Sequence, residues 1–175
     1  MKEISNPVIK VPKQESLPIN RYEEFRTLWR KATKEERSIL SSRKKEYMEL
    51  DDWCKKELEE SDCKKTFFAE TDQGKLVGII RVEITRKFGF NNFEAHIYNL
   101  FVEEQYRGHT IGSLLMNEAF RFLFKRTIVP SVVNLDVAET NTRAISFYDR
   151  KGFKIVQSKT KKVRGISYCT MIKKM

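Results

Sequence analysis

The chain has 175 residues, of which 40% are hydrophobic, with twelve Phe but only seven Gly and four Pro. This length and composition predict a single folded domain over residues 1–175, and they exclude a disordered chain or a fibrous repeat. The formal net charge of +10 fits a polyanionic partner, an anionic ligand or simply a basic surface.

The N-terminal third predicts an extended segment followed by two helices. Residues 6–17 hold an apolar run between prolines, which is typical of a short edge strand or an extended arm. A helix is expected from Asn20, which can cap it, with Glu23 three residues later as in a capping box. Its apolar face comprises Tyr22, Phe25, Leu28 and Trp29. A second amphipathic helix is predicted over about residues 43–60.

The pattern then changes to that of strands. Residues 66–70 and 75–84 are rich in apolar, β-branched and aromatic side chains, and the intervening Thr-Asp-Gln-Gly has the composition of a turn. These features predict a β-hairpin. After a loop over residues 86–92, a further strand is expected over residues 93–102.

A basic turn with two glycines follows that strand, and a helical pattern begins at once. Gly108 and Gly112 allow close approach of the backbone, Arg107 adds a cation, and the first turn of the helix offers unpaired N–H groups. This layout predicts a cradle for a pyrophosphate, although an ordinary strand-to-helix connection has a similar pattern. The helix has an apolar stripe that comprises Leu114, Leu115, Ala119, Phe122 and Leu123.

The C-terminal part predicts one more strand, a short helix and a final hairpin. A strand is expected over residues 132–138, a helix over 141–150, and strands over 153–159 and 166–173, joined by a basic turn over 161–165. The order of elements indicates an α/β protein, called α+β in some schemes. We expect a mixed, mostly antiparallel sheet with a central parallel strand pair and helices on both faces.

Cysteine usage and hydropathy bear on the compartment. Cys54, Cys63 and Cys169 form no CxxC pair, and their odd number leaves at least one thiol unpaired in a monomer. No His or Cys stands beside them in metal-ligand spacing, so no metal site is expected. The first twenty residues lack the apolar core of a signal peptide, and no apolar run is long enough to span a bilayer. These features predict a cytoplasmic protein that is not inserted in a membrane.

Two segments of the sequence carry a resemblance to a known family. LFVEEQYRGHTIGSLL, residues 100–115, places Arg107, Thr110 and Gly112 on the defined positions of an Arg/Gln-x-x-Gly-x-Gly/Ala turn. NTRAISFYDRKGF, residues 141–153, matches the pattern Asn-x-x-Ala-x-x-Phe-Tyr-x-x-x-Gly-Phe. Both segments, in this order, resemble the GNAT superfamily of acetyl-CoA-dependent N-acetyltransferases from the predicted hairpin onward.

The resemblance implies a reaction and a set of site residues. The chain would bind acetyl-CoA as cosubstrate and transfer its acetyl group to a primary amine by direct attack in a ternary complex, without a metal. The residues implied to bind acetyl-CoA are Leu100, Phe101, Val102, Arg107, Gly108, His109, Thr110, Ile111, Gly112, Ser113, Asn141 and Tyr148. Tyr148 would be the general acid that protonates the departing thiolate, although a helical aromatic at this position also suits a core. A homodimer is a family-level expectation.

The general base is sought on the strand before the cradle, because an acceptor ammonium must lose a proton. Glu94 and His96 point to one face of a regular strand with Tyr98, unless a β-bulge changes the parity. Glu94 stands where some members of the family carry a glutamate base, and imidazole titrates near neutral pH. Each can equally be a solvated or hydrogen-bonded strand residue. His109 is open between a phosphate contact and an exposed loop position.

Thr110 departs from the family pattern, in which this position is usually glycine. A β-branched residue is uncomfortable at positive φ, so the turn is either conventional here or strained. Alternatively, the Thr110 hydroxyl caps the helix.

Two other classes of function remain open. One is a non-catalytic acyl-CoA-binding or sensing module with the same cradle. The other is a nucleic-acid-binding protein, to which the net charge points, together with C-terminal basic residues that include Lys159, Lys161, Lys162, Arg164, Lys173 and Lys174. No recognised nucleic-acid-binding motif is present, which argues against this class. The acceptor amine is not identified: small amines, amino acids, antibiotics and protein N-termini or lysines all fit.

Overall fold

The computed structural model describes residues 21–35, 61–87, 93–127, 129–163 and 166–175. Three of the predictions, the extended segment over residues 6–17, the Asn20 cap and the helix over 43–60, lie outside these ranges.

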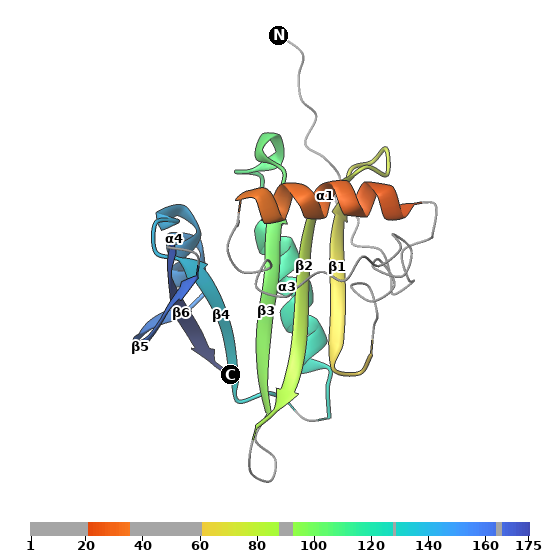
Figure 1. The fold of residues 1–175 in the computed structure, drawn as a ribbon. Coiled ribbons are helices and arrows are strands. Elements are labelled where there is room, and N and C mark those ends of the chain that lie inside the picture. Colours follow the sequence, from red (N-terminus) through yellow and green to blue (C-terminus); the bar gives the residue numbers. More distant parts are fainter. Residues whose placement is uncertain (1–20, 36–60, 88–92, 128, 164–165) are drawn as a thin grey trace, which may run out of the picture.

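A six-stranded sheet organises the described residues (Figure 1). Its order is β1-β2-β3-β4-β6-β5, with β3 and β4 parallel and every other neighbouring pair antiparallel. The strands are β1 (Lys64–Glu70), β2 (Leu76–Arg86), β3 (Phe93–Val102), β4 (Val132–Ala138), β5 (Lys154–Val163) and β6 (Ile166–Lys174). The predicted mixed sheet with a central parallel pair is therefore confirmed.

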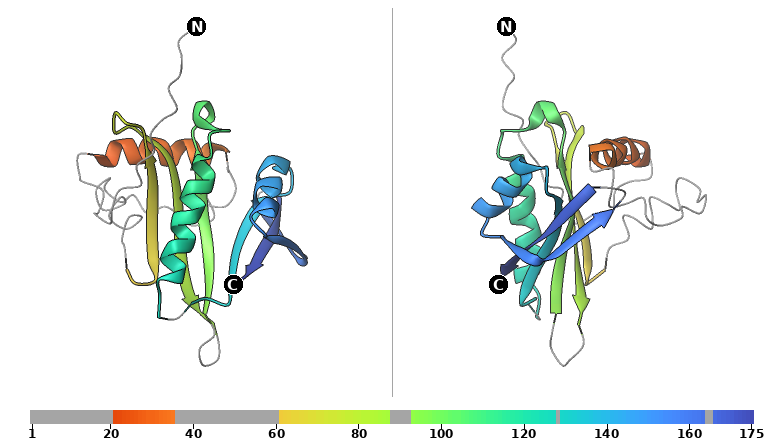
Figure 2. Two further views of the ribbon diagram at one scale, coloured as in Figure 1. Left: turned by 180° about the vertical axis from the view of Figure 1, so that it is seen from behind. Right: turned by 60° about the vertical axis from the view of Figure 1, so that its left-hand side comes forward.

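Helices cover both faces of this sheet, as predicted (Figure 2). They are α1 (Tyr22–Glu35), α3 (Ile111–Phe124) and α4 (Thr142–Arg150), and a 3₁₀ turn, η3 (Glu104–Tyr106), precedes α3. In Figure 2, α1 lies on one side of the sheet, and α3 and α4 lie on the other.

The α3 side of the sheet holds the main core. The stripe of α3 packs on alternate residues of the central strands, because successive side chains of a strand point to opposite faces. The buried cluster on this side of the sheet includes Ile111, Leu115, Ala119, Leu123, Ile80, Val82, Ala95, Ile97, Val133 and Leu135. One prediction was wrong: Leu114 is 40% exposed. At about 100° per residue it lies on the far side of the helix from the stripe of Leu115 and Ala119.

The α1 side holds a second, smaller core. The predicted apolar face of α1 is confirmed, and it packs on β1, β2 and β3 through a buried cluster that comprises Tyr22, Phe25, Leu28, Trp29, Ala32, Phe68, Leu76, Ile79 and Phe101. The Phe25 and Phe68 rings meet edge to face, with centroids 5.8 Å apart. Burying this stripe stabilises α1, since a helix of this length is marginal by itself.

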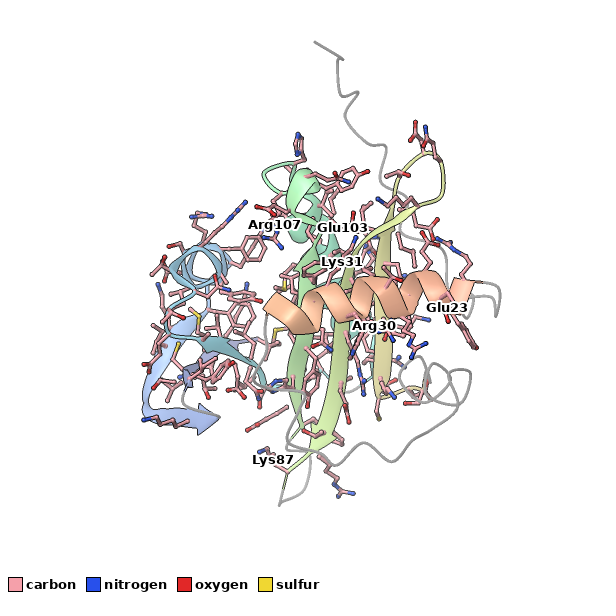
Figure 3. The ribbon with its side chains drawn as sticks, turned by 45° about the horizontal axis from the view of Figure 1, so that its top comes forward. Glu23, Arg30, Lys31, Lys87, Glu103 and Arg107 are labelled. Carbon is pink, nitrogen blue, oxygen red and sulfur yellow. The ribbon has the colours of Figure 1, made fainter. Side chains whose placement is uncertain are left out.

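An ion-pair cluster fastens α1 above the end of β3. The Glu103 carboxylate, whose side chain is 8% exposed, accepts hydrogen bonds from Lys31 of α1 and from Lys75, whose Nζ is 3.3 Å away. Figure 3 shows Lys31 and Glu103 side by side. Burial opposes ionisation of Glu103, but the hydrogen bonds from both lysines outweigh it and lower the pKa of the carboxyl below its usual value.

The final hairpin is longer than predicted. β5 extends to Val163, so the basic turn expected over residues 161–165 is shorter, and its first three residues belong to the strand. β6 pairs with the whole of β4, from Val132↔Lys174 to Ala138↔Tyr168. The hairpin is thereby attached to the central strands through β6.

Candidate functional site

The two parallel strands at the centre of the sheet separate along their length. Within these described strands the β3–β4 ladder holds three pairs, Glu94↔Val132, Ala95↔Val133 and His96↔Asn134. Beyond His96 the backbone groups on this edge of β3 are not used by the ladder. Such an edge can bind an extended ligand through main-chain hydrogen bonds.

A β-bulge lies in β3 just after the separation begins. Pairs Ile79↔Phe101 and Arg81↔Tyr98 enclose one residue of β2 but two residues of β3, and Asn99 has φ 53°. Asn tolerates this left-handed conformation better than most residues. The bulge follows Tyr98, so Glu94, His96 and Tyr98 keep the common face that regular alternation predicts.

The end of β3 is fixed by Arg107. Its Nε donates to the Val102 carbonyl oxygen at 2.7 Å, and its guanidinium carbon lies 5.5 Å from the centroid of the Phe101 ring. Of the residues predicted to bind acetyl-CoA, Phe101 directs its side chain into the α1 core, so only its backbone remains for a ligand. Arg107 therefore holds the turn against the end of β3, and its positive charge can also attract an anion.

The turn itself is strained at Thr110. Thr110 has φ 57° in the N-cap position of α3 and makes no side-chain capping hydrogen bond, so the predicted hydroxyl cap is wrong and the strained alternative is observed. Its carbonyl accepts from the N–H groups of Ser113 and Leu114 at 2.8 and 3.0 Å. The N–H groups of Ile111 and Gly112 precede these first helical bonds and lie at the positive end of the helix dipole.

Gly108 and His109, two neighbouring residues of the turn, lie in different environments. Gly108 has φ 89°, and a Cβ atom there would meet nothing within 4 Å. His109 is exposed, with Nδ1 3.2 Å from the Arg107 carbonyl oxygen, which is the solvent-facing position left open by the sequence.

The second sequence motif folds against the first. A Cβ atom on Gly112 would lie 3.6 Å from the Phe147 ring, so α4 packs directly on the first turn of α3. Asn141 caps α4, its side chain accepting from the Ala144 N–H at 3.1 Å. Tyr148 is buried, with edge-to-face contacts to Phe147 and Phe153 at 5.4 and 5.9 Å between centroids. The structure thus brings the turn and the Tyr148 helix together beside the separation of β3 and β4.

A polar patch that comprises Glu94, His96, Tyr98 and Asn134 lies on the α1 side of the sheet, where β3 and β4 begin to separate. Asn134 donates from Nδ2 to a Glu94 carboxylate oxygen at 3.3 Å, and its Oδ1 is hydrogen-bonded to Nδ1 of His96. The His96 and Tyr98 rings are 4.1 Å apart between centroids. The two candidate bases therefore share one neighbour, Asn134, on the adjacent strand.

Charged residues of β2, and Lys87 directly after it, border this patch. Arg81 lies 5.8 Å from the centroid of the Tyr98 ring and 3.5 Å from a Glu83 oxygen, and Nζ of Lys87 is 3.4 Å from Glu94. Figure 3 shows Lys87 at one end of the central strands and Arg107 at the other. The patch therefore lies between these two cations.

Two polar residues of β4 were missed from the sequence. Asn134 and Asp136 alternate with the buried Val133, Leu135 and Val137, so both face the α1 side. Asp136 accepts from the Thr170 hydroxyl at 2.6 Å and lies beyond the last β3–β4 pair, so it borders the separation. The alternation in strand 132–138 was the signal that could have identified them.

The described ranges contain neither a candidate metal site nor a candidate membrane-spanning helix. No three His, Cys, Asp or Glu side chains there are grouped so that they could hold a metal ion. No helix there is both long and apolar enough to cross a membrane.

The chain resembles known proteins in sequence. A family model described as the acetyltransferase (GNAT) family matches residues 22–153. An uncharacterized N-acetyltransferase of Methanocaldococcus jannaschii is 35% identical over 88 residues, which are 50% of this chain and 38% of that protein. An N-alpha-acetyltransferase of Sulfurisphaera tokodaii is 33% identical over 99 residues, 52% of this chain and 57% of that protein. The chain thus spans less than two thirds of either relative.

Solved structures share the fold at low identity. Arabidopsis thaliana NAA60 in complex with acetyl-CoA has a TM-score of 0.70 and 16% identity, and the match covers 96% of this chain and 99% of that one. Arabidopsis thaliana Naa50 in complex with the bisubstrate analogue CoA-Ac-MVNAL has a TM-score of 0.65 and 19% identity, with 95% and 99% covered.

Proposed function

The chain belongs to the acetyltransferase (GNAT) family, which confirms the resemblance found in its two motifs, and from this premise we propose that it transfers the acetyl group of acetyl-CoA to a primary amine. One observation carries the proposal: the contact of Gly112 with Phe147 joins the two motifs beside the edge of β3 that its parallel neighbour leaves unused. The turn before α3, the open edge of β3 and the buried Tyr148 then line one path for the proposed acetyl-CoA.

The described residues fit a pyrophosphate and an extended pantetheine arm. The N–H groups of Ile111 and Gly112 and the dipole of α3 suit the diphosphate. The β3 edge after His96, which includes Leu100 and Val102, suits the amide groups of the arm. The roles of Gly108, His109, Ser113 and Asn141 as further contacts belong to the same proposal.

The proposed chemistry needs an oxyanion donor, an acid and a base. Attack of the amine on a thioester creates an oxyanion and then expels a thiolate, so a backbone N–H of the open edge and a nearby acid both lower the barrier. Tyr148 is the proposed acid. Glu94 and His96 are the proposed candidates for removing the ammonium proton, and both lie on the polar patch beside the same separation.

The acceptor that we propose to test first is the α-amine of a peptide. Support comes from the name of the Sulfurisphaera tokodaii relative, an N-alpha-acetyltransferase, and from the peptide part of the analogue bound to Arabidopsis Naa50. Small amines, antibiotics and lysine side chains are the competing acceptors.

The test has a binding part and a chemical part. Acetyl-CoA at millimolar concentration should raise the melting temperature, since a ligand that binds only the folded state stabilises it. Free CoA should then appear with a lysine-containing peptide that has a free α-amine. It should not appear with the same peptide when its N-terminus is blocked, because only the lysine amine is then available. Absence of thermal protection would contradict acetyl-CoA binding. Protection without CoA release from any amine would support the non-catalytic acyl-CoA-binding alternative.

The nucleic-acid alternative has its own discriminating measurement. Binding to a nucleic acid should weaken steeply with salt. Weak binding whose affinity does not depend steeply on salt concentration would indicate that the basic residues form only a solvated surface.

A single domain, a cytoplasmic location and a possible homodimer complete the proposal. Within the described ranges Cys63 is an exposed and Cys169 a buried free cysteine, which suits a reducing compartment. Size-exclusion chromatography with light scattering would decide the oligomeric state.

A further inference from the structure

Asn134 lies between the two candidate bases and contacts both. Its amide bridges from β4 to β3, with Nδ2 toward the Glu94 carboxylate at 3.3 Å and Oδ1 toward Nδ1 of His96. The pair His96↔Asn134 is also the last pair of the parallel ladder. The bridge therefore stands where the strands begin to separate.

The chemistry of the three groups allows one orientation of the amide. An ionised carboxylate only accepts hydrogen bonds, so it requires the NH₂ side of the amide. The carbonyl oxygen of Asn134 then faces His96, and because this oxygen can only accept, Nδ1 of His96 must carry a proton. In the neutral imidazole Nε2 is consequently the nitrogen that holds the lone pair.

We propose that Asn134 is a positioning residue that holds His96 in its Nδ1–H tautomer and so makes Nε2 the proton acceptor for the incoming ammonium. This inference rests on the proposed acetyl transfer and chooses between its two candidate bases. Glu94 acts indirectly, by orienting the Asn134 amide. The arrangement places the basic nitrogen of His96 on the opposite side of the ring from the bridge.

Within the described ranges, charged groups on the His96 side of the sheet come from three strands and from α1. Glu94 is on the same strand as His96. Glu83 on β2 is the cross-strand partner of His96; Arg81 lies two residues before Glu83 on the same strand, and Lys87 follows the end of β2. Asp136 follows Asn134 on β4, and α1 carries Arg30 above the sheet (Figure 3). Cations and anions thus both lie on this side of the sheet, so the pH response must be measured on matched variants.

The tautomer is directly measurable, because the chain has only two histidines. In ¹⁵N-labelled protein above about pH 8, where imidazole is mostly neutral, long-range ¹H–¹⁵N spectra separate protonated from lone-pair nitrogens. His96→Gln assigns the signals, and His109 is the internal reference. We expect Nδ1–H for His96, and a shift toward Nε2–H in Asn134→Leu with the His109 signals unchanged. An Nε2–H tautomer in the unsubstituted protein would overturn the proposal, as would an unchanged tautomer in a folded Asn134→Leu variant.

Kinetics separate positioning from a merely structural role. Asn134→Leu should lower kcat/KM by about 10- to 100-fold, the usual effect of losing a group that orients a reactive side chain, with KM for acetyl-CoA unchanged. Asn134→Asp keeps an acceptor for Nδ1–H, so it should keep the tautomer and move the rise of kcat/KM to higher pH, because a carboxylate stabilises the imidazolium. Unchanged kcat/KM in Asn134→Leu would contradict the inference.

Failure of the proposed function would give different results from failure of the inference about Asn134. If no amine releases CoA, acetyl transfer is refuted and the role of Asn134 in it falls, whereas the spectra still report whether the amide selects the tautomer. If CoA is released but the tautomer is wrong, only the present inference fails.

Discussion

The two faces of the central sheet differ in the side chains that they carry. On the α3 side, alternate residues of β2, β3 and β4 are apolar and belong to one buried cluster with residues of α3, which includes Leu115, Ala95 and Ile97. On the α1 side, apolar cover extends over Phe101 and Ile79, and a polar patch that includes Glu94 and His96 lies beyond it. If the polar patch takes part in the proposed acetyl transfer, substitutions on the α3 side should change stability and substitutions in the patch should change activity.

The largest expected effect concerns the polar patch. Separate Glu94→Gln and His96→Gln variants should identify the base, since loss of a general base costs about 10²- to 10⁴-fold in kcat/KM and flattens its alkaline rise. From the Asn134 geometry we expect the flattened profile in His96→Gln, and a smaller loss in Glu94→Gln. Glu118→Gln on the outer side of α3 is the control and should leave the profile unchanged. Two normal profiles would place the base elsewhere.

The α3 face should respond in stability. Leu115 is fully buried, and truncating it to alanine should lower the free energy of unfolding by about 2–5 kcal/mol, through lost transfer energy and the cavity left behind. Leu114→Ala removes the same atoms from a position 40% exposed and should cost less than about 1 kcal/mol. Chemical denaturation measures both. Equal losses would contradict the assignment of the buried stripe.

The ion pairs that fasten α1 should give an intermediate, pH-dependent effect. The pKa of Glu103 is lowered on folding, so its contribution to stability is present above the unfolded value near 4.5 and is lost as pH falls through the lower folded value. Glu103→Gln should cost about 1–2 kcal/mol at neutral pH, less than a fully buried pair because both lysines are half-exposed. Its unfolding free energy should also fall less on acidification.

The adjacent Glu104 supplies the control for this measurement. It is exposed, and Glu104→Gln should leave both the stability and its acid dependence close to those of the unsubstituted protein. Equal acid sensitivity in the Glu103 and Glu104 variants would show that the ion pairs with Lys31 and Lys75 do not act in solution.

The smallest expected effect is at the strained turn. Glycine adopts positive φ without the steric cost that Thr110 bears, so Thr110→Gly should raise stability by about 1 kcal/mol. Thr110→Val keeps the β-branch and removes the hydroxyl, and should give no gain. A stabilised valine variant, or a destabilised glycine variant, would mean that strain at φ 57° is not what limits this turn.

Most of the secondary structure could be predicted because each element carries its own period. Strand 132–138 alternates between apolar and polar residues and has the bounds of β4, and the stripe of α1 recurs at helical spacing, so the start of that helix lies within two residues of the expected Asn20. Leu114 shows the limit. It is as apolar as Leu115, and only the direction from which the sheet approaches the helix decides that it is exposed.

The candidate site was predictable only in part. Both motifs and the shared face of Glu94 and His96 follow from local pattern. Asn134 was missed, because its partners are 40 and 38 residues away in the chain and no local period links them.

The sequence by itself determined the order of strands and helices, the two motifs, and the family to which they point, since these depend on residues close together in the chain. Tertiary structure alone decided that Arg107 bonds the end of its own strand, that Phe147 lies on Gly112, and that Asn134 joins two candidate bases. The physical reason is the register of β3 with β4, which a strand-helix-strand crossover sets through packing of the whole core.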